Sequence, residues 1–205
     1  MTTRSAAGIV RAALVAALGG IAGVGADEPP TVDGYGRIDG LYCAAAARLV
    51  LDDGRHFEVA ASFATGAFVD VRGAALDAPV CGRARRLSGG VVPVPARPAI
   101  ELTVPVAEWA QHAGDVDALA RRFTNARLRL RVLAADTAAA QAAALQIGTQ
   151  WLQQRPELMV RSIIVPLAAD GAARGWRVAF DAFDDTRSIH AATADDVVRL
   201  LSAAR

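Results

Sequence analysis

Arg127, Arg129 and Arg131 alternate with two leucines and a valine, and they form the densest group of potential ligand-binding side chains in this sequence. Strict alternation over six residues is typical of a strand with one buried face. On such a strand the three guanidinium groups share the other face, roughly 6.6–6.8 Å apart. Guanidinium forms paired hydrogen bonds with carboxylate, sulfate or phosphate, so these three residues are the binding site that we predict if this face binds a ligand. The preferred interpretation is a solvent-exposed face whose arginines pair with carboxylates on neighbouring strands, with Glu101 and Asp181 available.

Cys43 and Cys81 are the only cysteines in the chain. In an oxidising compartment an isolated pair usually forms one disulfide, so we predict a bond between Cys43 and Cys81. A bond that closes a loop of this size stabilises a fold by ~3–4 kcal/mol in the chain-entropy model. The alternative is a reactive Cys43 thiol with His56 as its partner, although no motif of a known cysteine enzyme surrounds either cysteine.

A hydrolase is the alternative class of function, since His56 or His190 could serve as a general base. However, none of the serines stands in the Gly-x-Ser-x-Gly motif of a nucleophile elbow. Residues 183–190, followed by Asp195 and Asp196, include groups that bind zinc or calcium, but their spacing matches no recognised site. A polar turn before a capped helix is the preferred interpretation. We predict no metal and no cofactor, and the absence of lysine excludes Schiff-base chemistry.

The first 26 residues have the layout of a secretory signal peptide. Arg4 and Arg11 give a positive start, residues 12–24 are apolar, and small residues end the segment at Ala26. We predict cleavage after Ala26 and therefore a periplasmic or secreted bacterial protein. The apolar run is shorter than the about 20 residues that span a bilayer, so no stable membrane insertion is expected after cleavage. An uncleaved membrane anchor is the alternative.

The remaining residues, 27–205, carry almost no net charge. Two of the 22 basic residues lie in the leader, which leaves 20 against 21 acidic residues and a formal charge of −1. A near-neutral chain lacks the field that attracts nucleic acid, so we predict no nucleic-acid partner. The length allows one domain or two small ones.

Residues 27–98 are expected to form a β-rich region. The expected elements are a glycine-rich loop at 33–40, strands at 48–51, 56–59 and 63–71, and irregular structure between 79 and 90. Turn-forming residues between 51 and 56 predict a hairpin. The three prolines in residues 91–98 favour extended structure and mark the best boundary, either between domains or as a stiff edge within one domain.

Residues 99–205 are expected to form an α+β domain. The expected elements are strands at 100–106, 127–133, 159–167 and 175–183, a hairpin turn at Asp170-Gly171, and helices at 116–126, 137–154 and 193–201. Asp115, Asp136 or Thr137, and Thr193 are the expected N-caps. This order fits a mixed or antiparallel sheet with helices packed on one face, so the predicted fold class is α+β.

The expected helix over 137–154 contains no charged residue. A surface helix usually carries charges opposite its core face, so we expect its outer face to be partly buried, by another part of the chain in the preferred interpretation or by a partner in the alternative. Leu145, Ile147, Trp151 and Leu152 are expected on its apolar side, with Trp151 in the core.

Together these patterns predict a non-enzymatic, exported protein that binds another envelope or secreted protein. Accessory protein, inhibitor, immunity factor and assembly subunit all fit this description. A small exported hydrolase that acts on cell-wall material or on a peptide is the alternative. A small-ligand carrier would need a sizeable apolar cavity.

Overall fold

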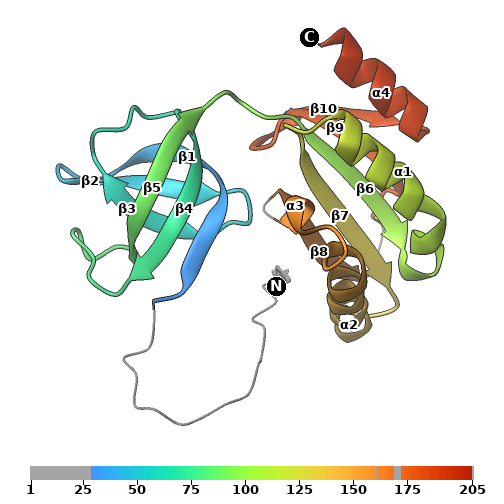
Figure 1. The fold of residues 1–205 in the computed structure, drawn as a ribbon, viewed down its shortest axis with the longest axis horizontal. Coiled ribbons are helices and arrows are strands. Elements are labelled where there is room, and N and C mark those ends of the chain that lie inside the picture. Colours follow the sequence, from blue (N-terminus) through green and yellow to red (C-terminus); the bar gives the residue numbers. More distant parts are fainter. Residues whose placement is uncertain (1–28, 160, 169–171, 205) are drawn as a thin grey trace, which may run out of the picture. The chain divides into compact units, whose positions relative to one another are not determined.

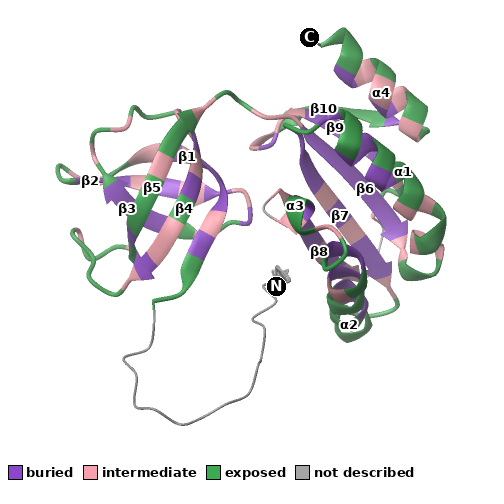
Figure 2. Ribbon diagram, in the orientation of Figure 1, coloured by how far each residue is buried: buried purple, intermediate pink, exposed green. Residues whose placement is uncertain are grey.

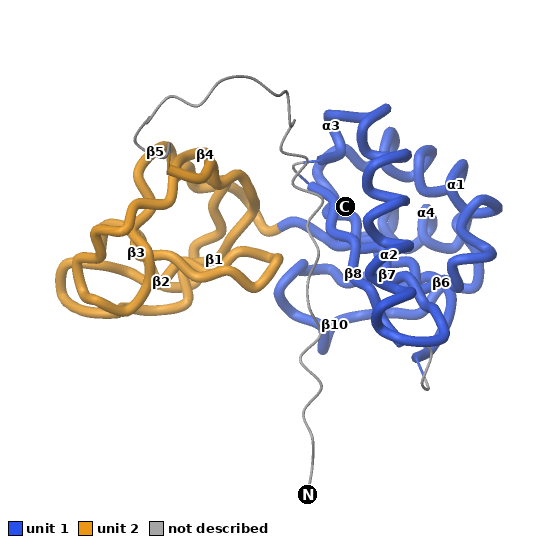
Figure 3. Tube along the Cα trace, turned by 90° about the horizontal axis from the view of Figure 1, so that it is seen from below, with its two compact units in different colours: residues 1–13, 97–205 blue, residues 14–96 orange. Residues whose placement is uncertain are grey.

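The computed structural model describes residues 29–159, 161–168 and 172–204, so the signal-peptide prediction lies outside the described residues. These residues form two compact units that divide between Ala96 and Arg97 (Figures 1 and 3). The first unit along the chain, residues 29–96 (orange in Figure 3, where the key calls it unit 2), consists of strands alone. The second, residues 97–204 (blue, unit 1 in the key), combines a mixed sheet with helices. The predicted α+β class is therefore confirmed at this level.

The first unit is a closed barrel of five strands in the order β1-β2-β3-β5-β4. The strands are β1 (Thr31–Cys43), β2 (Ala46–Leu51), β3 (His56–Ala60), β4 (Phe68–Leu76) and β5 (Arg86–Val94). All neighbours are antiparallel except β3 and β5, which are parallel. This strand order is that of the OB-fold, a five-stranded Greek-key barrel that carries many unrelated functions. Apolar side chains from all five strands fill its interior.

Glycines that were expected to form a loop instead allow strands to approach closely. The predicted loop at 33–40 is wrong, because these residues belong to β1. A Cβ atom on Gly36 would stand 2.7 Å from Leu49 Cδ1 and 2.9 Å from the Val50 carbonyl oxygen. A Cβ on Gly73 in β4 would stand 2.3 Å from the Ser88 carbonyl oxygen in β5. The glycines therefore mark barrel positions where the backbone or side chains of the neighbouring strand lie too close for any side chain.

The expected break between 79 and 90 is also wrong in its second half, because β5 begins at Arg86 and includes Gly89, Gly90 and Pro93. Pro93 lies opposite Val69 in β4. Since β5 pairs with β3 only at Arg86, the missing N–H of Pro93 removes no bond to β3.

The predicted hairpin between β2 and β3 is confirmed. Its turn contains Gly54 with φ +85°, a conformation that favours glycine. The buried Asp53 carboxylate accepts hydrogen bonds from the backbone N–H and from Nε of Arg55, at 3.0 and 2.8 Å. The strand expected at 63–71 begins later, since β4 starts at Phe68 and the preceding residues form a turn at Gly66.

The predicted disulfide between Cys43 and Cys81 is confirmed, with the two Cα atoms 6.0 Å apart. It joins the end of β1 to the loop of residues 77–85 between β4 and β5, across 38 residues of sequence.

Glu58 on β3 holds the same loop from the other side. Its side chain is fully buried. Its two carboxylate oxygens accept backbone N–H bonds from Val80, Cys81, Arg83 and Ala84, at 2.5 to 3.4 Å. One carboxylate therefore accepts hydrogen bonds from four backbone amides of a loop whose residues are not part of a β-sheet.

The second unit contains a five-stranded mixed sheet in the order β10-β9-β6-β7-β8. The strands are β6 (Ala99–Pro105), β7 (Arg127–Ala134), β8 (Ser162–Ala168), β9 (Gly175–Asp181) and β10 (Asp184–Ala191). Strands β6, β7 and β8 are parallel, and β9 and β10 add as antiparallel neighbours. The predicted hairpin around Asp170-Gly171 is wrong, because β8 pairs with β7 and β9 pairs with β6, so the two strands are not neighbours in the sheet. Asp170 and Gly171 themselves lie outside the described residues.

The helices of this unit share one face of the sheet. They are α1 (Trp109–Arg122), preceded by a 3-10 turn (Val106–Glu108), α2 (Thr137–Ile147), a π-helical turn (Gly148–Leu152), α3 (Pro156–Met159) and α4 (Ala194–Ala203). The steps from β6 to β7 and from β7 to β8 move in the same direction, and right-handed crossovers then place their helices on the same side. Side chains from α1 to α4 accordingly join one core with β6, β7, β8 and β9.

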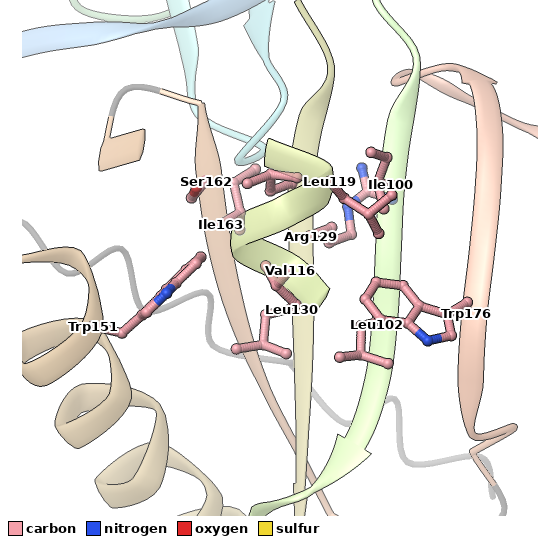
Figure 4. A pocket seen from close by; sticks show the side chains of 11 residues that line it. Ile100, Leu102, Val116, Leu119, Arg129, Leu130, Trp151, Ser162, Ile163 and Trp176 are labelled. Atoms are coloured by element: carbon pink, nitrogen blue, oxygen red, sulfur yellow. The ribbon is translucent and has the colours of Figure 1, made fainter. Parts of the chain in front are cut away.

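This core is closely packed. Figure 4 shows Val116 and Leu119 of α1 and Trp151 facing Leu102, Leu130 and Trp176 of the sheet. The remaining space has a volume of only about 10 Å³, which is the space of a single water molecule. The predicted core position of Trp151 is confirmed.

Helix boundaries were predicted correctly where a cap is present. Asp136, one of the two predicted candidates, accepts the N–H of Ala139 at 2.8 Å. Thr193 caps α4 as predicted and also forms a capping box with Asp196. The expected start at Asp115 is wrong, because α1 begins at Trp109, whose ring packs edge-on to Trp151 at 5.3 Å. The expected helix over 137–154 ends as α-helix at Ile147 and continues as the π-helical turn.

Residues 183–190 were expected to form a polar turn, and this is also wrong, because 184–191 form β10. β10 lies at the edge of the sheet and pairs with β9 alone. Its side chains are mostly exposed, and polar edge strands resist pairing with other chains.

Removing the disulfide should weaken the first unit selectively. We expect the C43A/C81A double variant to lower the free energy of unfolding of the barrel by about 3–4 kcal/mol, because the unfolded chain gains the entropy of an open loop. Both tyrosines lie in the barrel and all three tryptophans lie in the second unit. Urea unfolding is followed by tyrosine near-UV circular dichroism for the first unit and by tryptophan fluorescence for the second. An equal decrease in the free energy of unfolding obtained from both signals would contradict this prediction.

Glu58→Gln should weaken the barrel and flatten its response to acid. Burial alone would raise the pKa of the Glu58 carboxyl, but the four backbone N–H bonds lower it below its ordinary value of 4.5. Ionised Glu58 therefore stabilises the barrel above the unfolded pKa, and this contribution is lost as the pH falls through the folded pKa. The measurement is the free energy of unfolding of both proteins between pH 7 and pH 3. Asp77→Asn, which alters an exposed carboxylate of the same loop, is the control that should keep the wild-type pH dependence.

Candidate functional site

The arginine row lies on β7, the second strand from one edge of the mixed sheet, between β6 and β8. Leu128, Leu130 and Val132 of this strand are buried against the helices. Arg127, Arg129 and Arg131 alternate with them and therefore lie on the opposite face, where Arg127 is buried and Arg129 and Arg131 are half-buried.

Glu101 on β6 is the centre of this arginine-bearing face. The register places it directly opposite Arg129 on β7 and opposite Arg177 on β9. Its carboxylate lies 3.2 Å from Arg129 Nη1, 3.3 Å from Arg131 Nε and 3.8 Å from Arg177 Nη1, and its side chain is only 5% exposed. Three guanidinium groups thus surround one buried carboxylate.

A second carboxylate closes the cluster at its rim. Asp185 on β10 lies 3.0 Å from Arg177 Nη2 and 3.5 Å from Arg129 Nη1. Arg129 Nη2 also donates to the carbonyl oxygen of Ala182 at 3.2 Å. Asp181, considered as a partner from sequence, instead accepts the backbone N–H of Phe183 at 2.8 Å.

The three predicted site residues therefore differ in role. Arg129 and Arg131 converge on Glu101, and Figure 4 shows the Arg129 guanidinium reaching from β7 toward β6. Arg127 is only 3% exposed and lies opposite Ala99 on β6. Arg131 retains the most solvent exposure, at 31% of its side chain.

The ion-paired groups of this cluster carry one more positive than negative charge. Arg129, Arg131 and Arg177 contribute +3, while Glu101 and Asp185 contribute −2, so the balance of these five side chains is +1.

Arg161 supports the same part of the sheet and was missed from sequence. Its guanidinium donates to the carbonyl oxygens of Ala120, Phe123 and Ala126 at 2.7 to 3.2 Å and so completes the end of α1. Burial, followed by the positive charge of Arg127, lowers the pKa of Arg161 from its ordinary value. Its partners lie 35 to 41 residues away in the chain, so no local pattern could reveal it.

His56, considered as a general base, is exposed on β3, and no hydrogen bond in the described part of the chain joins it or His190 to a serine. Ser162 Oγ is buried in the core and has no hydrogen-bond partner there. Ser188 Oγ donates to the carbonyl oxygen of Asp185 at 2.8 Å. His190 lines a groove between β10 and α4, but Asp196 in that groove pairs with Arg199.

No cluster of three or more metal-ligating side chains occurs within residues 29–159, 161–168 and 172–204. In the same ranges no helix is long and apolar enough to cross a membrane. The chain matches no protein-family model, no curated protein and no solved structure.

The outer face of α2 differs from the expectation. It was predicted to be partly buried, but Gln141, Ala142, Leu145 and Gln146 are all exposed in the structure, Leu145 at 54%. Leu145 therefore does not belong to the apolar side of the helix, whereas Ile147 does. Because alanine and glutamine are strong helix formers, α2 needs no surface charges to remain helical.

Removing the central carboxylate should destabilise the second unit strongly. Glu101→Gln leaves three guanidinium groups facing one another without their shared counter-charge, and we expect a loss of about 3–5 kcal/mol in the free energy of unfolding. Urea unfolding followed by tryptophan fluorescence measures it. Glu108→Gln breaks an exposed ion pair with Arg174 and should cost less than about 1 kcal/mol. Similar losses in both variants would contradict a structural role for Glu101.

Proposed function

We propose that this chain is an exported, non-enzymatic protein of the bacterial envelope that binds an acidic segment of another protein through its arginine-bearing sheet face. The observation that carries the proposal is the group of three arginines around Glu101, which with Asp185 leaves one positive charge in excess, on the face opposite the helices. An accessory, inhibitory, immunity or assembly role is compatible with this surface.

The geometry of the row supports an acidic peptide or loop as the ligand. Arg129 and Arg131 are two residues apart on one strand, about 6.6–6.8 Å along the chain, and carboxylates on alternate residues of an extended partner segment have the same spacing. Guanidinium binds carboxylate through charge-assisted hydrogen bonds. Glu101 holds both arginines in place before a partner arrives, so less side-chain entropy is lost on binding.

Two further features support export. The leader has the pattern of a signal peptide, and both cysteines of the chain form a disulfide, a bond that persists in oxidising compartments. The near-neutral charge disfavours nucleic acid as the partner.

Arg131→Ala is the variant that separates binding from folding, because Arg127 is buried and Arg129 belongs to a three-partner network. The probe is a fluorescein-labelled peptide of alternating glutamate and threonine, with a glutamine–threonine peptide as its uncharged counterpart. We expect saturable binding of the acidic peptide alone, about tenfold weaker in Arg131→Ala because one charge-assisted contact is lost. Fluorescence anisotropy at low and high salt measures the affinity.

The matched control is Arg187→Ala, which removes an exposed arginine of β10 in the same sheet. We expect it to bind the acidic peptide as the wild type does. Equal binding by wild type and Arg131→Ala, or equal affinity for the acidic and uncharged peptides, would refute recognition at the arginine row.

A further inference from the structure

The barrel of the first unit is closed by a single point of contact. β3 pairs with β2 over its whole length, and β5 pairs with β4 from Arg86 to Val94. Between β3 and β5 the only ladder pair is Glu58 with Arg86. Because the two strands are parallel, the residues after Glu58 in β3 and after Arg86 in β5 continue in the same direction. These residues form no further ladder pairs with each other.

A cleft of about 380 Å³ opens where the strands separate. Val59 on β3 and Leu87 on β5 belong to the barrel core, and the half-buried Phe63 and Val91 pack against that core. All four line the cleft, which therefore has an apolar floor. Its volume lies within the range of sites that bind ligands.

The walls of the cleft are strand edges. The edge of β3 beyond Glu58 and the edge of β5 beyond Arg86 form no ladder with another described strand. Ser88, Gly89 and Gly90 on β5 are exposed, as the green colour of this strand in Figure 2 shows. Unpaired edges offer alternating N–H and C=O groups, and an added strand satisfies such groups.

We propose that this cleft binds an extended peptide segment of a partner protein, which adds as a strand along the free edge of β5. A peptide backbone is the ligand whose donors and acceptors repeat at the spacing of the edge. Alternate apolar side chains of the peptide then face Val59, Leu87 and Phe63. Pro93 supplies no N–H and ends the usable edge.

The charges around the cleft favour an acidic residue in the peptide. Arg86 lines the cleft, is exposed, and forms no ion pair with the described residues. Glu58 also lines it, but its carboxylate is occupied by the four loop amides. This site lies in the barrel, so it is independent of the arginine row in the second unit.

The first test uses the mature chain and the peptide acetyl-Glu-Val-Thr-Val-Thr-amide. We expect saturable shifts of backbone amide resonances in β3 and β5, and slower hydrogen exchange of alternate amides between Leu87 and Val92. Two N-methylated forms of the peptide serve as further probes. Each form carries methyl groups on one alternate set of its amides, so that the peptide is altered while the protein stays wild type. Strand addition requires that one form binds at least about tenfold more weakly while the other binds as the parent does.

The second test uses variants of the cleft. Ser88→Trp fills the cleft and should abolish binding, whereas Leu41→Trp, exposed on β1 and outside the cleft, should not. Arg86→Glu should reverse the preference from the glutamate peptide to its lysine counterpart, and Arg83→Glu, exposed on the neighbouring loop, should leave it unchanged.

Three results would overturn the proposal. They are an absence of amide shifts at millimolar peptide, equal binding of both N-methylated forms, and binding that survives Ser88→Trp. A concentration-dependent dimer that protects the same β5 amides without peptide would assign the edge to a second copy of the chain and would also overturn it. Failure of the acidic peptide at the arginine row affects none of these outcomes, because the variants lie in different units.

Discussion

Glu101 carries a negative charge into the middle of a sheet, and the second unit is arranged around the need to compensate it. The arginines that do so come from both neighbouring strands, and the register places Arg129 and Arg177 directly opposite the carboxylate. A slip of one residue in either pairing would turn the arginine to the helix side and leave Glu101 buried without it. The charge cluster therefore disfavours the wrong registers, while the apolar residues on the other face supply the burial that drives folding.

Glu58 is a buried carboxylate of the first unit that must also be compensated, and its donors are of a different kind. No cation reaches its carboxylate in the described structure; four backbone amides of the loop 77–85 do. The disulfide restrains the same loop at Cys81. Together they hold the loop against the one place where β3 and β5 meet. The loop and the opening beside it are thus fixed before any ligand is present, which lowers the entropy cost of binding there.

Local patterns were sufficient for the hairpin at Gly54, the caps at Asp136 and Thr193, the disulfide and the alternation of β7, because each depends on neighbouring residues or on the only pair of cysteines. They failed where a distant partner decides. Glycines in β1 and β5 were interpreted as breaks because the strands that crowd them lie far along the chain. β10 was missed because an edge strand needs no apolar face. For the site, Glu101 could be suggested as a counter-charge from sequence, but the burial of Arg127 and the role of Arg161 depend on packing that no spacing reveals.

The contact between Arg161 and the end of α1 has a consequence for the order of assembly. The carbonyl groups of Ala120, Phe123 and Ala126 all accept hydrogen bonds from Arg161 at the entrance to β8, and that of Phe123 also accepts the backbone N–H of Ala126. During synthesis, α1 and β7 emerge well before that donor exists, so the last turn of α1 remains frayed at this stage. In a nascent chain that ends before Arg161, the last turn of α1 lacks these hydrogen bonds. Residues 120–126 should then be more sensitive to protease than in a chain that includes Arg161.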